Sequence, residues 1–74
     1  MYIEISDRDL VDSLRSHLRQ EGCPSERRSD EVVEVRVLWS PENPLTEAEE
    51  RAKVFGHLRE WCAANPGVKA NILS

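Results

Sequence analysis

Three short segments in which apolar and polar residues alternate are the strongest constraint on how this chain folds. The segments are residues 1–6, 31–39 and 68–73. A period of two puts every second side chain on the same face of a strand, so each segment predicts a strand with one buried face. Sheets with helices on both faces have strands that are apolar throughout. We therefore expect an antiparallel sheet that is covered on one side. In the middle strand, the face expected to be buried consists of Val33, Val35, Val37 and Trp39.

A first helix is expected between the strands at 1–6 and 31–39. Ser6 followed by Asp9 is typical of a helix N-cap with an acidic partner three residues on. The helix should run to about residue 21 and end at Gly22, because glycine adopts positive φ at helix ends without steric cost. Its apolar stripe is made of Leu10, Val11, Leu14 and Leu18.

A second helix is expected before the last strand. Thr46 and Glu49 predict a capping box at its start, and Asn65-Pro66-Gly67 predicts its end. We expect its buried stripe to consist of Ala48, Phe55, Leu58 and Cys62, with Val54 and Trp61 on the flank. Trp61 would then extend an exposed patch near Val54.

Residues 23–29 decide between two architectures. With a strand there, the chain is an α+β domain of ferredoxin-like βαββαβ order, with a single antiparallel sheet and two helices on one face. This strand would lie at an edge of the sheet, where Pro24 and the polar residues after it are tolerated. The alternative is a three-stranded βαβαβ sheet in which 23–29 is a loop. We favour four strands, in one domain that spans residues 1–74.

No set of residues in the sequence points to catalysis, a metal or a cofactor. There is no glycine-flanked serine, no glycine-rich phosphate loop and no evident Cys–His pair. No CxxC or HxxxH pair is present, and His57 and Cys62 point to different sides of a helix. We therefore expect a protein that is not an enzyme and has no metal site and no cofactor.

Charge and cysteine content bear on the partners and the compartment. The formal net charge of −4 disfavours binding to nucleic-acid phosphates. No run of 18 apolar residues would span a membrane, and no secretory leader pattern opens the sequence. The two cysteines, Cys23 and Cys62, are expected at opposite ends of the domain as reduced thiols. Together these features favour a cytoplasmic protein.

The uncovered face of the sheet is the main candidate for function. Contiguous exposed apolar residues mark interaction sites, and this face would mix apolar and charged side chains. We expect a homodimer or a complex with a protein partner, in which Glu34 and Arg36 fix the register across a twofold axis. The candidate partner-binding residues are Tyr2, Val32, Glu34, Arg36, Leu38 and Leu73.

A small-ligand regulatory domain is the alternative function. The start of the first helix would offer unpaired backbone N–H groups to an anion near Ser6 and Arg8.

Overall fold

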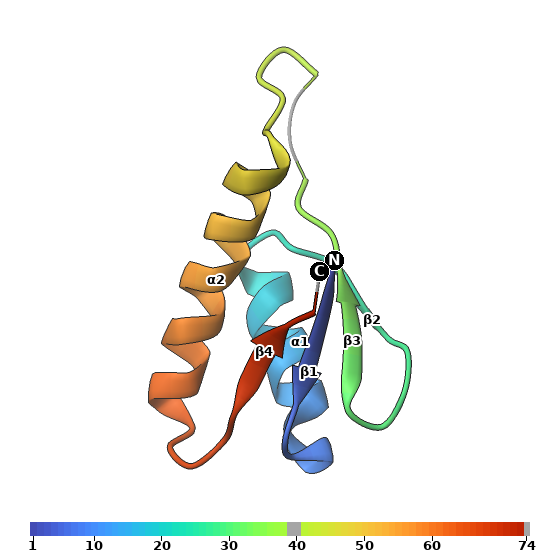
Figure 1. Cartoon of the computed structure of the whole chain (residues 1–74), viewed down its shortest axis with the longest axis vertical. Helices are drawn as coiled ribbons and strands as arrows, with labels where there is room; N and C mark the ends of the chain where they lie inside the picture. Colours follow the sequence, from blue (N-terminus) through green and yellow to red (C-terminus); the bar gives the residue numbers. More distant parts are fainter. Residues whose placement is uncertain (39–40, 74) are drawn as a thin grey trace.

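The computed structural model describes residues 1–38 and 41–73, which form a four-stranded antiparallel sheet and two α-helices (Figure 1). The strand order is β2-β3-β1-β4. The fourth strand is therefore confirmed, and the three-stranded alternative is wrong. Trp39, which was expected to be buried, lies outside the described residues. The elements are β1 (Tyr2–Ile5), the 3-10 turn η1 (Arg8–Leu10), α1 (Val11–Gln20), β2 (Ser25–Arg27), β3 (Val32–Val35), α2 (Glu47–Ala64) and β4 (Ala70–Ile72).

The strand register separates a buried face of the sheet from an open one. Ile3 of β1 lies opposite Val33 of β3 on one side and Ile72 of β4 on the other. These residues pack with both helices, and α1 lies behind the strands in Figure 1 while α2 runs beside β4. The core consists of Ile3, Ile5, Val11, Leu14, Leu18, Cys23, Val33, Val35, Val54, Leu58 and Trp61.

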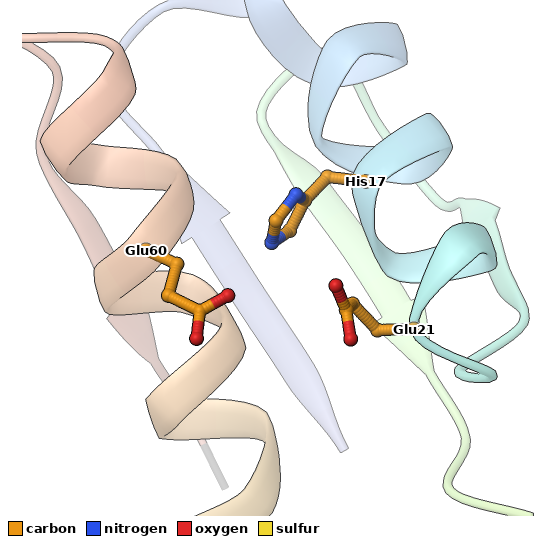
Figure 2. Close-up of side chains that lie close together, drawn as sticks. All are labelled: His17, Glu21 and Glu60. Atoms are coloured by element: carbon orange, nitrogen blue, oxygen red, sulfur yellow. The ribbon is translucent and has the colours of Figure 1, made fainter.

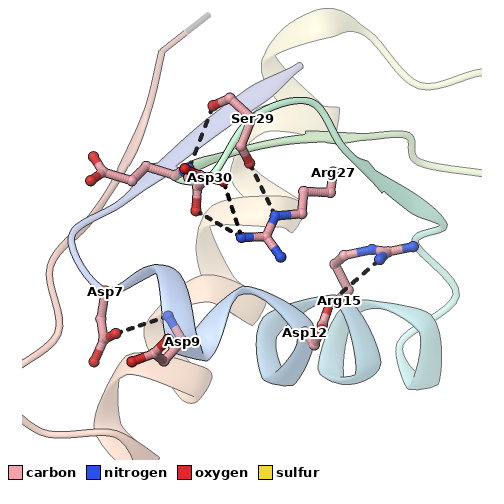
Figure 3. A network of polar contacts seen from close by, with 8 residues as sticks. Asp7, Asp9, Asp12, Arg15, Arg27, Ser29 and Asp30 are labelled. Carbon is pink, nitrogen blue, oxygen red and sulfur yellow. Dashed lines mark hydrogen bonds and ion pairs between the residues drawn. The ribbon is translucent and has the colours of Figure 1, made fainter.

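The first helix starts later than expected, so the predicted N-cap at Ser6 is wrong. Ser6 instead continues the pairing of β1 with β4: its amide donates to the Lys69 carbonyl, and its hydroxyl accepts from the Lys69 amide, both at 2.8 Å. Asp7 caps the 3-10 turn η1 that precedes the helix, and its carboxylate accepts from the Asp9 amide at 3.0 Å (Figure 3). The helix α1 itself begins after Leu10, which makes no side-chain cap hydrogen bond. At the other end the prediction is confirmed, because Gly22 follows the helix with a φ of +80°.

The capping box of α2 is confirmed, but its buried side differs from the expected one. Thr46 Oγ1 accepts from the Glu49 amide at 3.1 Å, and the Glu49 carboxylate accepts from the Thr46 amide at 3.3 Å. Trp61 is only 3% exposed, whereas Phe55, which was assigned to the core, is 52% exposed. Apolar side chains occur on several sides of α2, so the contact with α1 selects which of them is buried. The buried side consists of Val54, Leu58 and Trp61.

The turn between β2 and β3 is held by an arginine of the edge strand. Arg27 donates from Nε to the Ser29 carbonyl at 3.2 Å and from Nη2 to the Asp30 carbonyl at 3.4 Å (Figure 3). The same Nη2 lies 3.7 Å from the Asp30 carboxylate. These contacts hold the turn that sets β2 beside β3.

Candidate functional site

The open face of the sheet carries most of the side chains predicted to bind a partner. Tyr2 pairs with Glu34, and Glu4 pairs with Val32. Tyr2 and Glu4 flank the buried Ile3 on β1, and Val32 and Glu34 flank the buried Val33 on β3. Arg36 and Leu38 follow β3, beyond the end of the strand.

Two exposed apolar side chains, Tyr2 and Leu73, meet at the end of the sheet where β1 begins and β4 ends. The Leu73 amide donates to the Tyr2 carbonyl at 2.8 Å, so the two residues lie side by side on neighbouring strands. Tyr2 is 40% exposed and Leu73 is 50% exposed. Leu38, after β3, is 68% exposed. Tyr2 and Leu73, which we call the apolar end, are the apolar neighbours that the structure brings together on the open face.

A charged group lies next to the apolar end. Arg28 donates from Nε to Glu34 at 2.9 Å, also donates from Nη2 to the same oxygen, and lies 3.0 Å from the Glu26 carboxylate. The Arg28 hydrogen bond is the main reason why the pKa of the Glu34 carboxyl is below its ordinary value, and the same bond raises the pKa of Arg28. Glu34 is thus held ionised by its own chain.

Arg28 is a residue that the sequence reasoning missed. Arg36 was expected to act with Glu34, and its charge does favour the ionised Glu34, but the direct contact comes from Arg28. The sequence did contain a signal for this contact, because Arg28 and Glu34 lie on opposite sides of the turn between residues 28 and 32. Residues that flank a hairpin turn approach each other across the strand pair.

Ser6 and Arg8, the two residues of the alternative ligand site, lie in different surroundings. The Ser6 hydroxyl is occupied by the Lys69 amide, as described above. The hollow next to Ser6 has a volume of about 380 Å³, and its charged lining residues are Glu4, Glu31 and Lys69. Arg8 lies in η1, between the acidic Asp7 and Asp9. The surroundings of the helix start therefore combine the carboxylates of Asp7 and Asp9 with the cation of Arg8.

A groove between α2 and β4 is a second apolar surface, which the sequence did not predict. Its volume is about 510 Å³. The exposed ring of Phe55 lines it, together with Leu58 and Ile72. The Arg59 guanidinium carbon lies 6.0 Å from the centre of the Phe55 ring. The remaining lining residues are Ala48, Arg51, Ala52, Ala70 and Asn71.

The packing of α1 against α2 also brings together a group that the sequence reasoning missed, shown in Figure 2. His17 and Glu21 come from α1 and its C-cap, and Glu60 comes from α2. One ligand atom from each of the three residues lies within 4.8 Å of the other two. The i,i+4 spacing of His17 and Glu21 was a visible signal, but their proximity to Glu60 depends on the rotation of α2.

The two cysteines are free thiols with little nucleophilic character. Cys23 is buried in the core, and Cys62 is partly buried against it. Burial is the main cause that raises the pKa of both thiols. A protonated thiol is a poor nucleophile and a poor metal ligand, so both cysteines act here as core side chains.

Comparison of the chain with protein-family models, with curated proteins and with solved structures finds no match. Within residues 1–38 and 41–73, no helix has both the length and the apolar character needed to cross a membrane.

Proposed function

We propose that this chain is a non-catalytic interaction module that self-associates through the open face of its sheet. The observation that carries the proposal is the apolar end, where Tyr2 and Leu73 lie side by side and both are exposed. Burial of apolar surface is the dominant favourable contribution to most protein association. A second copy of the chain supplies the same apolar end, because a twofold interface brings identical patches together.

The fold that we propose for this module is the ferredoxin-like βαββαβ arrangement. The strand order β2-β3-β1-β4 supports it, because β3 inserts between the two strands that α1 connects. That is the pattern of a split βαβ unit. The second such unit, β3-α2-β4, has β1 inserted in the same way.

Charges next to the apolar end would set the register of the two copies. The ionised Glu34 and its partner Arg28 lie on the same open face, one strand away from Tyr2. Charged groups at the rim of an interface contribute more to specificity than to affinity, since water still solvates them. Tyr2, Leu38 and Leu73 would therefore provide most of the binding energy, and Arg28, Glu34 and Arg36 the orientation.

The test is light scattering on a size-exclusion column over a series of protein concentrations. We expect the mass to rise from 8.5 kDa toward twice that value as the concentration increases. Leu73→Glu and Tyr2→Ser should each shift the chain to the monomer, because they place a charge or a small polar group in the contact. Neither residue lies in the core cluster, so the domain should remain folded, which circular dichroism verifies.

Phe55→Ser is the matched control for these variants. Phe55 is as exposed as Leu73, but it lies in the groove between α2 and β4. If Phe55→Ser abolishes the dimer while Leu73→Glu leaves it intact, the groove is the interface and the proposal is wrong. A wild-type chain that stays monomeric at every concentration contradicts self-association.

We further propose that the module functions in a reducing compartment, such as the cytoplasm. The free thiols of Cys23 and Cys62 support this, since unpaired buried cysteines are typical of proteins that do not meet an oxidising environment. Tagged protein in fractionated cells gives the direct test, and enrichment in an oxidising compartment would contradict the proposal.

A further inference from the structure

The strongest unexplained feature of the molecule is the group of ligand atoms between α1 and α2. We propose that His17, Glu21 and Glu60 bind a divalent transition-metal ion, that Zn²⁺ is the ion their chemistry fits best, and that His57 positions Glu21. This site lies between the helices, and the proposed sheet-face interface does not include it. The metal site and the sheet-face interface can therefore be tested independently of each other.

The ligand set favours zinc over the hard cations. One imidazole nitrogen and two carboxylate oxygens would surround the ion. Mg²⁺ and Ca²⁺ prefer oxygen ligands alone, whereas imidazole nitrogen suits Zn²⁺ and its neighbours in the first transition row. Three protein ligands would leave one position of a tetrahedral zinc ion to water.

The ligand atoms are close enough to meet on one ion after a small side-chain movement. They lie within 4.8 Å of one another in the metal-free chain. Bonds of about 2.1 Å to a tetrahedral zinc ion place the ligand atoms about 3.4 Å apart. Glu21 and Glu60 are exposed, so their side chains have the rotational freedom to close this difference. The backbones of the two helices need not move.

The His17 ring is already fixed by a contact to the opposite helix. Its Nε2 lies 3.1 Å from the carbonyl oxygen of His57. A carbonyl oxygen only accepts hydrogen bonds, so in this contact Nε2 carries the proton, and the metal ion would have to bind the lone pair of Nδ1. Histidines that bind metals commonly donate their second ring N–H to a carbonyl or a carboxylate, which fixes the tautomer and the ring orientation.

His57 is placed to hold Glu21 in position. Its Nδ1 lies 3.8 Å from a carboxylate oxygen of Glu21, which is an ion-pair distance, longer than a hydrogen bond. Its Nε2 is buried and has no hydrogen-bond partner within the described part of the chain, so the polar contact of the ring is on the Nδ1 side. Polar partners outside the ligand set orient a ligating carboxylate toward the metal. We therefore assign His57 as a positioning residue.

The negative charge of Glu21 and Glu60 also favours the binding of a cation between the helices. Glu21 and Glu60 bring two negative charges into the same small volume, in a chain whose net charge is already −4. A divalent ion cancels both charges and links the two helices. Small domains with a limited core often gain stability from such a link, and binding to the folded state alone raises the melting temperature by mass action.

Isothermal titration of the full chain with ZnCl₂ tests the site. We expect one Zn²⁺ per chain. Glu60→Gln and Glu21→Gln, which preserve side-chain size, should each weaken binding at least about tenfold. Glu47→Gln is the control, because Glu47 is an exposed glutamate in the first turn of the same helix. With Zn²⁺ at about a hundred times its Kd, the melting temperature of the wild type and of the control should rise by about 10 °C or more.

Three results would overturn the proposal. The first is no heat and no change in melting temperature at roughly millimolar ZnCl₂. The second is equal affinity in the wild type and both glutamine variants. The third is a Co²⁺-loaded chain whose absorption spectrum contains a thiolate charge-transfer band, since that would place Cys23 or Cys62 on the metal. A His17→Gln variant adds a further check, and Glu60→Gln remains decisive if that variant does not fold.

Discussion

The indole Nε1 of Trp61 donates a hydrogen bond to the Ser13 hydroxyl at 3.1 Å, and this contact joins α2 to α1 across 48 positions of the sequence. Trp61 is almost completely buried, so the bond lies at the edge of the core. Together with the burial of Val54 and Leu58, it defines the side of α2 that faces the core. The same orientation of α2 places His57 and Glu60 beside His17 and Glu21, and leaves Phe55 on the surface.

Variants of this pair should separate the packing of Trp61 from its hydrogen bond. Trp61→Ala should lower the free energy of unfolding by about 3–5 kcal/mol, because it removes the largest core side chain and leaves a cavity. Ser13→Ala should cost about 0.5–1 kcal/mol, since it leaves the indole N–H without its partner. Urea denaturation measures both. Ser16→Ala, an exposed serine of the same helix, is the control. A loss for Ser16→Ala equal to that for Ser13→Ala would mean that the bond is without effect.

The capping box of α2 gives a second prediction. Thr46→Ala should lower the free energy of unfolding by about 1 kcal/mol, because the Glu49 amide loses its acceptor at the helix start. Thr46→Ser keeps the hydroxyl and should cost much less. Urea denaturation of the two variants side by side is the measurement, and equal losses would show that the hydroxyl is not what stabilises this helix end.

Two glycines should respond in opposite directions to the same substitution. Gly22 has a φ of +80°, so Gly22→Ala should destabilise the chain by about 1–2 kcal/mol. Gly56 lies inside α2, and a Cβ there meets nothing within 4 Å. Gly56→Ala should therefore stabilise the chain by about 0.5–1 kcal/mol, since alanine is the better helix former. Calorimetric melting temperatures of the two variants test this prediction. A change of the same sign in both would contradict the different backbone requirements that we assign to Gly22 and Gly56.

The ion pair on the open face should make stability depend on pH. Arg28 lowers the pKa of Glu34 in the folded chain below its ordinary value of 4.5. A carboxyl whose pKa is lowered by folding contributes stability above its unfolded pKa, and the contribution is lost as the pH falls through the folded pKa. The wild type should therefore lose more stability than Glu34→Gln when the pH is lowered from about 6 into the range below 4.5.

The measurement for Glu34 is the urea midpoint as a function of pH. Glu4→Gln is the matched control, because Glu4 lies on the same face of the sheet and makes no ion pair among residues 1–38 and 41–73. Its acid response should follow the wild type. If Glu34→Gln also follows the wild type, the Arg28 contact does not stabilise the folded state.

Local signals in the sequence were sufficient for most of the elements. The alternation around Ile3 and Val33 predicted two strands and the faces they bury, because the pleat alone sets that period. The capping box at Thr46 and the glycine at position 22 predicted helix ends, because each acts through contacts only a few residues apart. The edge position of residues 25–27 followed from Pro24 and the polar residues after it.

The sequence-based predictions were wrong where a residue suits two different structural positions. Ser6 has the side chain of an N-cap, but β4 returns beside it, and the Lys69 amide takes its hydroxyl. The central residues of α2 present apolar side chains in several directions, so periodicity did not select Trp61 over Phe55. In both cases a partner distant in sequence made the choice.

The sequence by itself determined two helices, three of the strands and the open face of the sheet, because these depend on periodicity, capping and glycine conformation within short stretches of chain. It favoured the fourth strand, β2, and the sheet pairing decided it. Only the tertiary structure decided which side of α2 is buried, which arginine holds Glu34, and that His17, Glu21 and Glu60 meet. These three outcomes depend on the packing of one helix against the other and on the hairpin register. Both join residues through space, and no local pattern encodes them.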